Sequence, residues 1–324
     1  MIDFSTKEFP AFLGSSANDL NRAAVILAGG EGSRLRSLTQ RITGDDRPKQ
    51  FCPIVGGETL LDITRSRVAM SVSRENTYFS LTQKHERYFQ RQLAGVGKNQ
   101  MVVQPEARGT APAIIYSLLR VAKDMSDPTI AFFPSDHYFS NDEKFIAAVD
   151  AAYRAAEREP ETVVLLGIEA DKAETSYGWI QPHDSFFSGV PGSVNRVDRF
   201  WEKPDSRTAQ KLRAEGCLWN SFVMVGKTSA FLKMVEEALP LMYRMFSAGA
   251  SELGKVSEGA VIRSVYSWIN ETNFSTEVLE RSSEMLRVLR VGDVGWSDLG
   301  EPERVLGAIK QLGITPRWLQ PVAA

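Results

Sequence analysis

The sequence predicts an α/β fold in which a mostly parallel sheet carries helices on both faces. Short apolar runs of strand length alternate with amphipathic helical segments from about residue 20 to residue 170. A glycine-rich turn directly follows the first apolar run, residues 24–27. Beyond about residue 170 the strands have fewer helices between them, which indicates an added mixed or antiparallel region. This order of elements is typical of Rossmann-like sheets, where ligands bind at the carboxyl ends of the strands.

The expected elements follow one another closely along the chain. The predicted strands are 24–27, 76–81, 101–103, 129–133, 163–168, 177–180, 197–201, 218–225 and 285–291. The predicted helices are 59–70, 85–93, 110–121, 145–156, 208–214, 230–239 and 302–311. Thr59 and Thr110 are the predicted N-caps of two of them. Because the carboxyl ends of parallel strands meet at one edge, the loops after Leu27, Val103 and Phe133 are predicted to share one crevice.

Composition excludes several classes of protein. The chain has 324 residues, 43% of them hydrophobic, and a net charge of -2, which suits a large core but gives no basic footprint for nucleic acid. Two cysteines, Cys52 and Cys217, are too few for a disulfide framework and suit a cytoplasmic protein. Residues 1–20 lack the pattern of a signal peptide, and no apolar run approaches the roughly 18 residues of a membrane span.

Residues 28–33, Ala-Gly-Gly-Glu-Gly-Ser, form a candidate anion site. Its glycines allow a tight turn with exposed N–H groups, and a helix start after the turn adds a favourable dipole. Arg34, Arg47 and Lys49 supply positive charge nearby, so the stretch indicates a polyphosphate site. A tight strand-to-helix connection that binds nothing remains the simpler alternative. The dinucleotide fingerprint and the Gly-Lys-Ser/Thr phosphate loop both fail, because a third glycine and a lysine after Gly32 are missing.

Three charged residues after predicted strands could carry chemistry. Asp136 and Asp298 each follow a strand, where a carboxylate either forms a turn or binds a hard cation. Magnesium is usually held by one or two carboxylates while substrate phosphates complete its shell. Lys203, before Pro204, is either a solvated surface lysine or a cation held rigidly enough to neutralise a phosphate.

At these residues the sequence resembles a known family. Residues 29–35 (GGEGSRL), a Leu-Thr pair and residues 48–51 (PKQF) resemble the signature of sugar-phosphate nucleotidyltransferases, and PKQF is most similar to mannose-1-phosphate guanylyltransferases. The resemblance implies one nucleotidyltransferase domain over 1–324, with a nucleotide-binding half at about 20–170 and a sugar-phosphate-binding half at about 171–324. It implies Mg²⁺ as cofactor, and a nucleoside triphosphate, with GTP favoured, plus a hexose 1-phosphate as substrates. The products would be pyrophosphate and a nucleotide sugar, with GDP-mannose favoured.

The resemblance also implies roles for individual residues. The catalytic cations would be Arg34, Lys49 and Lys203, and the magnesium ligands Asp136 and Asp298. Nucleotide binding is expected at Ala28, Gly29, Gly30, Gly32, Ser33, Gln104, Gly109 and Thr110. Sugar-phosphate binding is expected at Tyr177, Gly178, Glu202, Lys203, Asn220 and Ser221.

Two departures from the family pattern leave the nucleobase open. Gln104 and Gly109 stand where guanylyltransferases usually have glutamate and asparagine. A carboxylate would accept from both donors of guanine, whereas the Gln104 amide suits uracil or thymine equally well. A uridylyl- or thymidylyltransferase for another hexose 1-phosphate therefore stays open. On the sugar side, Ser176 and Phe222 stand where relatives have glycine.

Two further interpretations belong to other classes of protein. A noncatalytic relative could bind a nucleotide sugar and regulate an enzyme. Such a protein would have no need to keep all five of the charged residues Arg34, Lys49, Asp136, Lys203 and Asp298. A glycosyltransferase on a similar fold would typically carry an Asp-x-Asp metal motif, which the sequence lacks. No nucleic acid or membrane partner is expected, and a homo-oligomer is left open.

Overall fold

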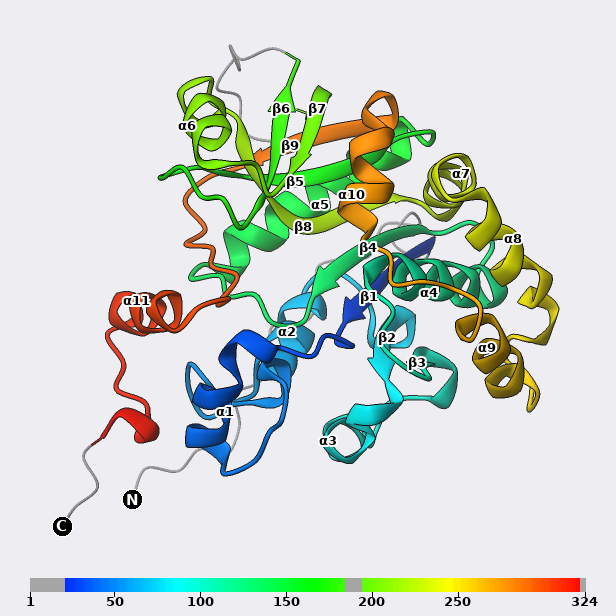
Figure 1. Ribbon diagram of the computed structural model, residues 1–324, viewed down its shortest axis with the longest axis horizontal. Coiled ribbons are helices and arrows are strands. Elements are labelled where there is room, and N and C mark those ends of the chain that lie inside the picture. Colours follow the sequence, from blue (N-terminus) through cyan, green and yellow to red (C-terminus); the bar gives the residue numbers. More distant parts are fainter. Residues whose placement is uncertain (1–20, 184–193, 321–324) are drawn as a thin grey trace.

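One mixed sheet forms the centre of the molecule. The computed structural model describes residues 21–183 and 194–320 (Figure 1). Within these residues nine strands lie in the order β3-β2-β1-β4-β8-β5-β9-β7-β6, and β8 also pairs with β6. The strands are β1 (Arg22–Leu27), β2 (Thr77–Thr82), β3 (Met101–Gln104), β4 (Thr129–Pro134), β5 (Val163–Glu169), β6 (Gly178–Pro182), β7 (Val194–Glu202), β8 (Leu218–Lys227) and β9 (Leu286–Val291). The predicted α/β fold class is confirmed; the prediction of no signal peptide concerns residues 1–20, outside the described part.

The sheet has a parallel part and an antiparallel part. Strand β1 pairs in parallel with β2 and β4, and β2 pairs in parallel with β3. Strand β8 then lies antiparallel between β4 and β5, and β6 and β7 pair antiparallel at the far edge. The later strands therefore extend the same sheet, and the carboxyl ends of β1, β3 and β4 meet along one edge.

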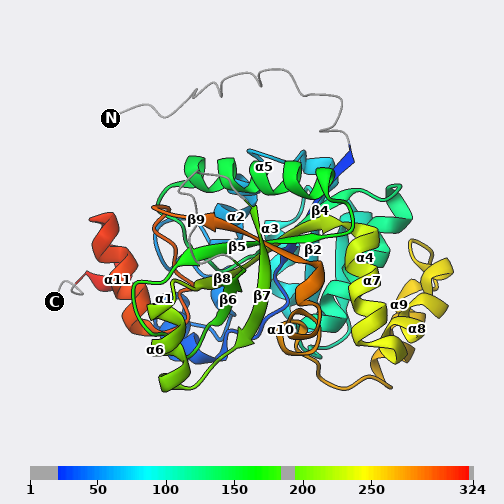
Figure 2. The ribbon, with the colours of Figure 1, turned by 90° about the horizontal axis from the view of Figure 1, so that it is seen from above.

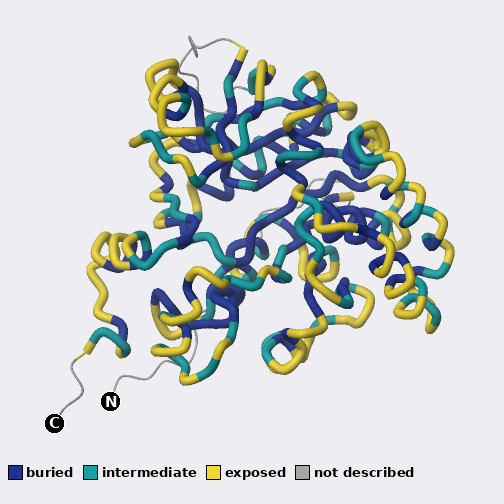
Figure 3. Tube along the Cα trace, viewed as in Figure 1, coloured by how far each residue is buried: buried dark blue, intermediate teal, exposed yellow. Residues whose placement is uncertain are grey.

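Helices cover both faces of this sheet. They are α1 (Arg36–Thr43), α2 (Leu60–Val68), α3 (Glu86–Gln92), α4 (Thr110–Asp124), α5 (Asp142–Arg158), α6 (Ser206–Ala214), α7 (Thr228–Ala238), α8 (Pro240–Ala248), α9 (Glu258–Tyr266), α10 (Phe274–Glu277) and α11 (Pro302–Leu312). Alternate β1 residues enter separate cores: Val25 packs in the one that α4, α7, α8 and α9 join, and Ile26 in the one that α2, α3, α5 and α6 join. The strands are accordingly buried at the centre and the outer helix faces exposed (Figure 3).

The helix α11 packs back on the beginning of the chain. Val305 and Ile309 of α11 share a third apolar cluster with Leu35, Cys52 and Ile54. Figure 2 shows α11 at the opposite end of the molecule from α8 and α9. Burial raises the pKa of the Cys52 thiol to about 12, so this cysteine is an inert packing residue at neutral pH. In the described ranges no helix combines the length and apolarity needed to cross a membrane.

One of the two predicted helix caps is right and one is wrong. The Thr59 hydroxyl accepts a hydrogen bond from the Asp62 amide at 3.2 Å and caps α2. Thr110, in contrast, is the first residue of α4, and Gly109 is the N-cap. The Thr110 hydroxyl accepts instead from the Phe274 amide at 2.8 Å. A distant segment has taken the capping group, which local sequence does not reveal.

Candidate active site

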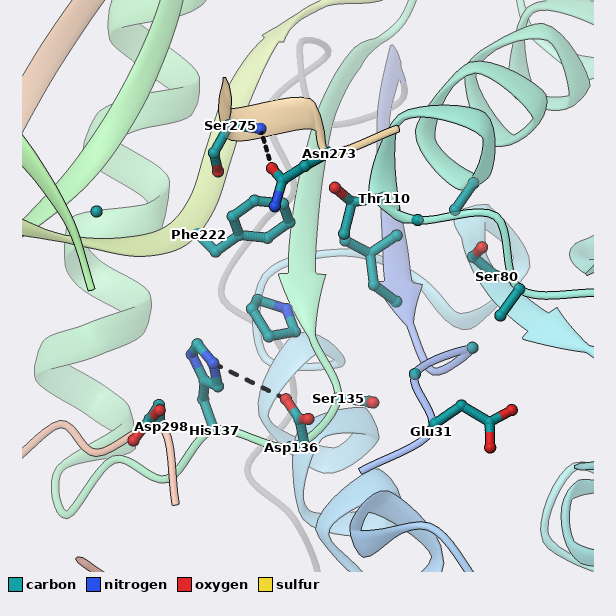
Figure 4. A pocket seen from close by; sticks show the side chains of 18 of the residues that line it. Glu31, Ser80, Thr110, Ser135, Asp136, His137, Phe222, Asn273, Ser275 and Asp298 are labelled. Carbon is teal, nitrogen blue, oxygen red and sulfur yellow. Dashed lines mark hydrogen bonds and ion pairs between the residues drawn. The ribbon is translucent and has the colours of Figure 1, made fainter. Parts of the chain in front are cut away.

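A cavity of about 510 Å³ opens at the carboxyl ends of β1, β3 and β4, where the crevice was predicted (Figure 4). The predicted nucleotide residues that line it are Gly29, Gly30, Gln104, Gly109 and Thr110. The predicted sugar-phosphate residues that line it are Tyr177, Gly178, Glu202, Lys203 and Asn220. Asp136 and Asp298 line the same cavity. Residues predicted as one site from stretches more than 250 positions apart therefore meet in one space.

The glycine turn after β1 is held in shape from behind. Gln50, which is buried, donates through Nε2 to the carbonyl oxygens of Ala28 at 3.0 Å and Gly30 at 2.8 Å. The Thr82 hydroxyl donates to the Gly29 carbonyl at 2.9 Å. A side chain at Gly29 would stand 2.9 Å from both Thr82 Oγ1 and Gln104 Nε2, so the turn has no room for one. Ala28, Gly32 and Ser33 lie outside the cavity lining.

Lys49 is buried behind the wall of the cavity. Its Nζ donates to the carbonyl oxygens of Asp298 at 2.6 Å and Leu299 at 3.2 Å, and lies 3.3 Å from Asp136 Oδ2. One ammonium thus ties the loop that carries Asp298 to the side chain of Asp136. This is a geometry for positioning the two carboxylates relative to each other.

The two predicted arginines lie away from the cavity. Arg34 has an exposed side chain and pairs with Glu301 at 3.0 Å. Arg47 pairs with Asp45 at 2.7 Å. The hydrogen bond from Arg47 lowers the pKa of Asp45 to about 2. Both guanidinium groups have partners within the chain, and neither lines the cavity.

Asp298 is held by several donors. Arg304 Nη1 lies 2.8 Å and 2.9 Å from its two oxygens, and the Tyr177 hydroxyl donates at 2.9 Å. The same arginine reaches Glu174 at 2.9 Å and the Ser176 hydroxyl at 2.7 Å, so it joins α11 to the segment before β6. Arg304 was not predicted, because nothing in its helix pattern distinguishes it from a solvated arginine.

A magnesium ion that phosphates help to hold would need a carboxylate oxygen with a lone pair to spare from each of Asp136 and Asp298. Asp298 Oδ1 accepts from Tyr177, Gly300 and Arg304, so Oδ2, which accepts from Arg304, is the oxygen it could offer. Asp136 Oδ2 pairs with Lys49. The nearest charged partner of Asp136 Oδ1 among the described residues is His137 Nε2, at 3.8 Å. That oxygen retains lone pairs for a hard cation. Figure 4 shows His137 between the two aspartates. Residues 21–183 and 194–320 contain no group of three or more potential metal ligands, so substrate phosphates would have to complete the shell.

The Asp298 network makes stability depend on pH. Burial by itself raises the pKa of Asp298, but His137, Arg304 and Lys49 outweigh it and hold that pKa below the usual 3.8. A depressed carboxyl pKa stabilises the fold above the unfolded value, and this stability is lost as the pH falls through the folded value. We expect Asp298→Asn to unfold at lower urea concentration than wild type at pH 7, with the difference shrinking below about pH 5. A difference in urea midpoint that is constant with pH would contradict this.

Two residues at the predicted sugar-phosphate stretches have unusual backbone geometry. Lys203 has φ +49° and Phe222 has φ +60°, values that non-glycine residues seldom adopt, and both line the cavity. The Lys203 ammonium pairs with Glu202. Such strain clusters at functional sites, where surrounding structure maintains it. Ser221, by contrast, is fully buried and donates to the Leu166 carbonyl at 2.7 Å, so its hydroxyl faces away from the cavity.

Several lining residues were not predicted. Glu271, Asn273 and Ser275 come from the segment before and within α10, for which the sequence indicated no function. Asn273 accepts from the Ser275 amide at 2.7 Å, and this cap was a readable signal for a helix start. Its position at the cavity was not readable, because it depends on packing between the two halves of the chain. Trp296 and His137 complete the wall beside the aspartates.

Comparison with known proteins identifies the family of this chain. A family model described as nucleotidyl transferase matches residues 23–313. The xanthan biosynthesis protein XanB of Xanthomonas campestris pv. campestris is 30% identical over 300 residues, covering 89% of this chain and 60% of XanB. Mannose-1-phosphate guanylyltransferase 2 of Escherichia coli O157:H7 is 28% identical over 294 residues, covering 86% of this chain and 58% of the relative.

A solved structure agrees with these sequence matches. The crystal structure described as mannose-1-phosphate geranyltransferase from Thermus thermophilus is 27% identical, with a TM-score of 0.75, over 88% of this chain and 79% of that chain. The chain spans between 43% and 60% of the length of the curated relatives that it matches. The predicted resemblance is thereby confirmed: this chain belongs to the nucleotidyl transferase family.

Proposed function

We propose that the chain transfers a nucleotidyl group from a nucleoside triphosphate to a hexose 1-phosphate, with GTP and mannose 1-phosphate as the favoured pair. The observation that carries the proposal is that one cavity is lined by the glycine turn, by Lys203 and Asn220, and by Asp136 and Asp298. The names of the relatives, among them a mannose-1-phosphate guanylyltransferase, support the choice of substrates.

The proposed reaction is a direct displacement. A phosphate oxygen of the hexose 1-phosphate attacks the α-phosphorus of the triphosphate and forms a new P–O bond. The bond from that phosphorus to the bridging oxygen breaks, and pyrophosphate leaves with the electron pair. No covalent enzyme intermediate is needed, so the protein contributes positioning and charge stabilisation.

The residues would divide this work between them. Amides of the turn at Gly29 and Gly30 would bind the triphosphate, and Lys203 would bind the phosphate of the sugar. Mg²⁺ on Asp136 and Asp298 would supply neutralisation of phosphate charge when bound. Lys49, buried against both aspartates, would act on the reaction by keeping their spacing. Arg34 could reach a phosphate only by leaving Glu301.

The proposed halves of the domain follow the cavity with one amendment. Residues about 20–170 would form the nucleotide-binding half and about 171–324 the sugar-phosphate-binding half. The segment 271–275 lines the cavity but lies on the loop of Gly109 and Thr110, so we assign it to the nucleotide end.

A substrate matrix tests the proposal. Four nucleoside triphosphates are combined with mannose, glucose and galactose 1-phosphates, with Mg²⁺ present or chelated, and pyrophosphate release is measured. We expect release to be fastest for GTP with mannose 1-phosphate and to stop on chelation. Faster release with UTP or TTP would support the uridylyl or thymidylyl alternative. Release with no pair would contradict an enzyme and support a regulatory binding protein.

A further inference from the structure

The amide of Gln104, expected to contact the nucleobase, is already engaged within the protein. Its Nε2 donates to Ser80 Oγ and to the Leu81 carbonyl, each at 3.2 Å. Its Oε1 accepts from the Tyr266 hydroxyl at 3.0 Å. Both N–H groups are therefore used, and one oxygen lone pair is left. Gln104 cannot accept from the two neighbouring donors of guanine, at N1 and the 2-amino group.

The glycine at 109 admits another segment at this end of the cavity. Gly109 has φ +82°, and a Cβ there would stand 2.8 Å from the carbonyl carbon of Thr272. The Thr272 amide donates to the Arg108 carbonyl, and its carbonyl accepts from the Ala111 amide, both at 3.0 Å. These bonds fix the segment across the loop in a position that an asparagine at 109 would block.

The segment brings a carboxylate, Glu271, into the cavity lining beside Gly109. The other four carboxylates of the lining are ion-paired within the chain: Glu31 with Lys84, Asp136 with Lys49, Glu202 with Lys203, and Asp298 with Arg304. Among the described lining residues, Glu271 is the carboxylate without an ion pair or hydrogen bond. Glu271 is exposed and lies next to the loop of Gly109, where a substrate group can reach it.

We infer that Glu271 binds the donor edge of a guanine base and replaces the glutamate missing at position 104; the inference rests on the proposed function. A carboxylate offers two acceptor oxygens, which match N1–H and the 2-amino group of guanine. Uracil and thymine present one donor flanked by carbonyl oxygens, which a carboxylate repels. Adenine presents an acceptor at N1. Glu271 is thus a specificity-determining residue that selects guanine over uracil, thymine and adenine.

Inosine triphosphate gives the sharpest test, because it differs from GTP only by the missing 2-amino group. Binding of GTP and ITP is measured by calorimetry, and pyrophosphate release is measured with mannose 1-phosphate. For wild type we expect GTP to be preferred over ITP by about tenfold or more. In Glu271→Ala, which removes both contacts, we expect GTP affinity to fall about a hundredfold and ITP affinity about tenfold, so that the preference disappears. Glu271→Gln, which loses one acceptor, should lie between them.

The control variant is Glu106→Ala. Glu106 belongs to the loop of Gly109, which the Glu271 segment crosses; it pairs with Arg108 at 2.9 Å and lies outside the cavity lining, so its removal should leave the GTP-to-ITP ratio unchanged. A wild-type ratio in Glu271→Ala, or no preference for GTP in wild type, would overturn the inference. Pyrophosphate release with an unchanged ratio would sink the inference alone. The expected binding ratios without any release would sink the proposed reaction alone.

Discussion

Replacing Asp136 with asparagine is expected to lower kcat by at least about a hundredfold, the size of effect seen when one preorganised electrostatic contact is lost. Asp136 lines the cavity and carries an oxygen that faces only His137, at 3.8 Å. An amide in its place removes one negative charge from the proposed cation site and leaves Lys49 without its counter-ion. Steady-state pyrophosphate release at saturating substrates measures the effect.

Asp293→Asn serves as the matched control for this substitution. Asp293 precedes Asp298 by a few residues, is exposed, pairs with Lys144 and lies outside the cavity lining. It should keep wild-type turnover. Circular dichroism of both variants establishes that they are folded. Wild-type turnover in a folded Asp136→Asn protein would count against the metal assignment.

Lys49→Met is expected to reduce the free energy of unfolding by about 3 kcal/mol, because it leaves a partly buried carboxylate and two carbonyl oxygens without their donor. The Lys49 side chain is 9% exposed, and its ammonium serves Asp136 and the carbonyls of Asp298 and Leu299. Methionine keeps most of the volume, so the loss reports the charge. Urea unfolding followed by fluorescence measures it.

Arg34→Met is the control for Lys49→Met. It separates the loss of the buried Lys49 contacts from a general effect of removing a cation. The Arg34 side chain is 56% exposed, and its pair with Glu301 should contribute at most about 1 kcal/mol. We therefore expect Arg34→Met to unfold at nearly the wild-type urea concentration. Equal urea midpoints for Lys49→Met and wild type would show that the buried Lys49 contacts to Asp136 and to the Asp298 loop do not stabilise the fold.

The parallel part of the fold could be predicted because its signals are local. An apolar run of strand length followed by glycines or an aspartate specifies both the strand and the position of its loop. The sheet rule then brings Gly29 and Asp136 to one edge without any knowledge of packing. The same reasoning anticipated the later strands, but their place in the sheet, with β8 between β4 and β5, depends on long-range pairing.

The remaining site residues escaped prediction for a physical reason. Arg304 and Glu271 come from segments whose local pattern is an ordinary helix and an ordinary turn. Arg304 supports the cavity from behind through nearby Asp298 and distant Glu174. Glu271 lines the cavity because its segment packs on the distant Gly109 loop. A single sequence carries no signal for such contacts.

The sequence motifs also did not distinguish residues that line the cavity from residues that are buried behind its lining. Residues 48–51 supply both Lys49 and Gln50, and both are buried. Gln50 fixes the carbonyls of the glycine turn, and Lys49 fixes the aspartates. The chemistry of these residues was readable, whereas their direction was set by tertiary packing.

We expect one cavity to hold both substrates around Asp136 and Asp298. The most direct measurement is a crystal structure of the chain with Mn²⁺ in place of Mg²⁺, a non-hydrolysable GTP analogue and mannose 1-phosphate. We expect anomalous density for Mn²⁺ at the two aspartates, the phosphates at Gly29 and Gly30, and the sugar beside Asn220. Nucleotide or metal bound elsewhere, with this cavity filled by water, would contradict it.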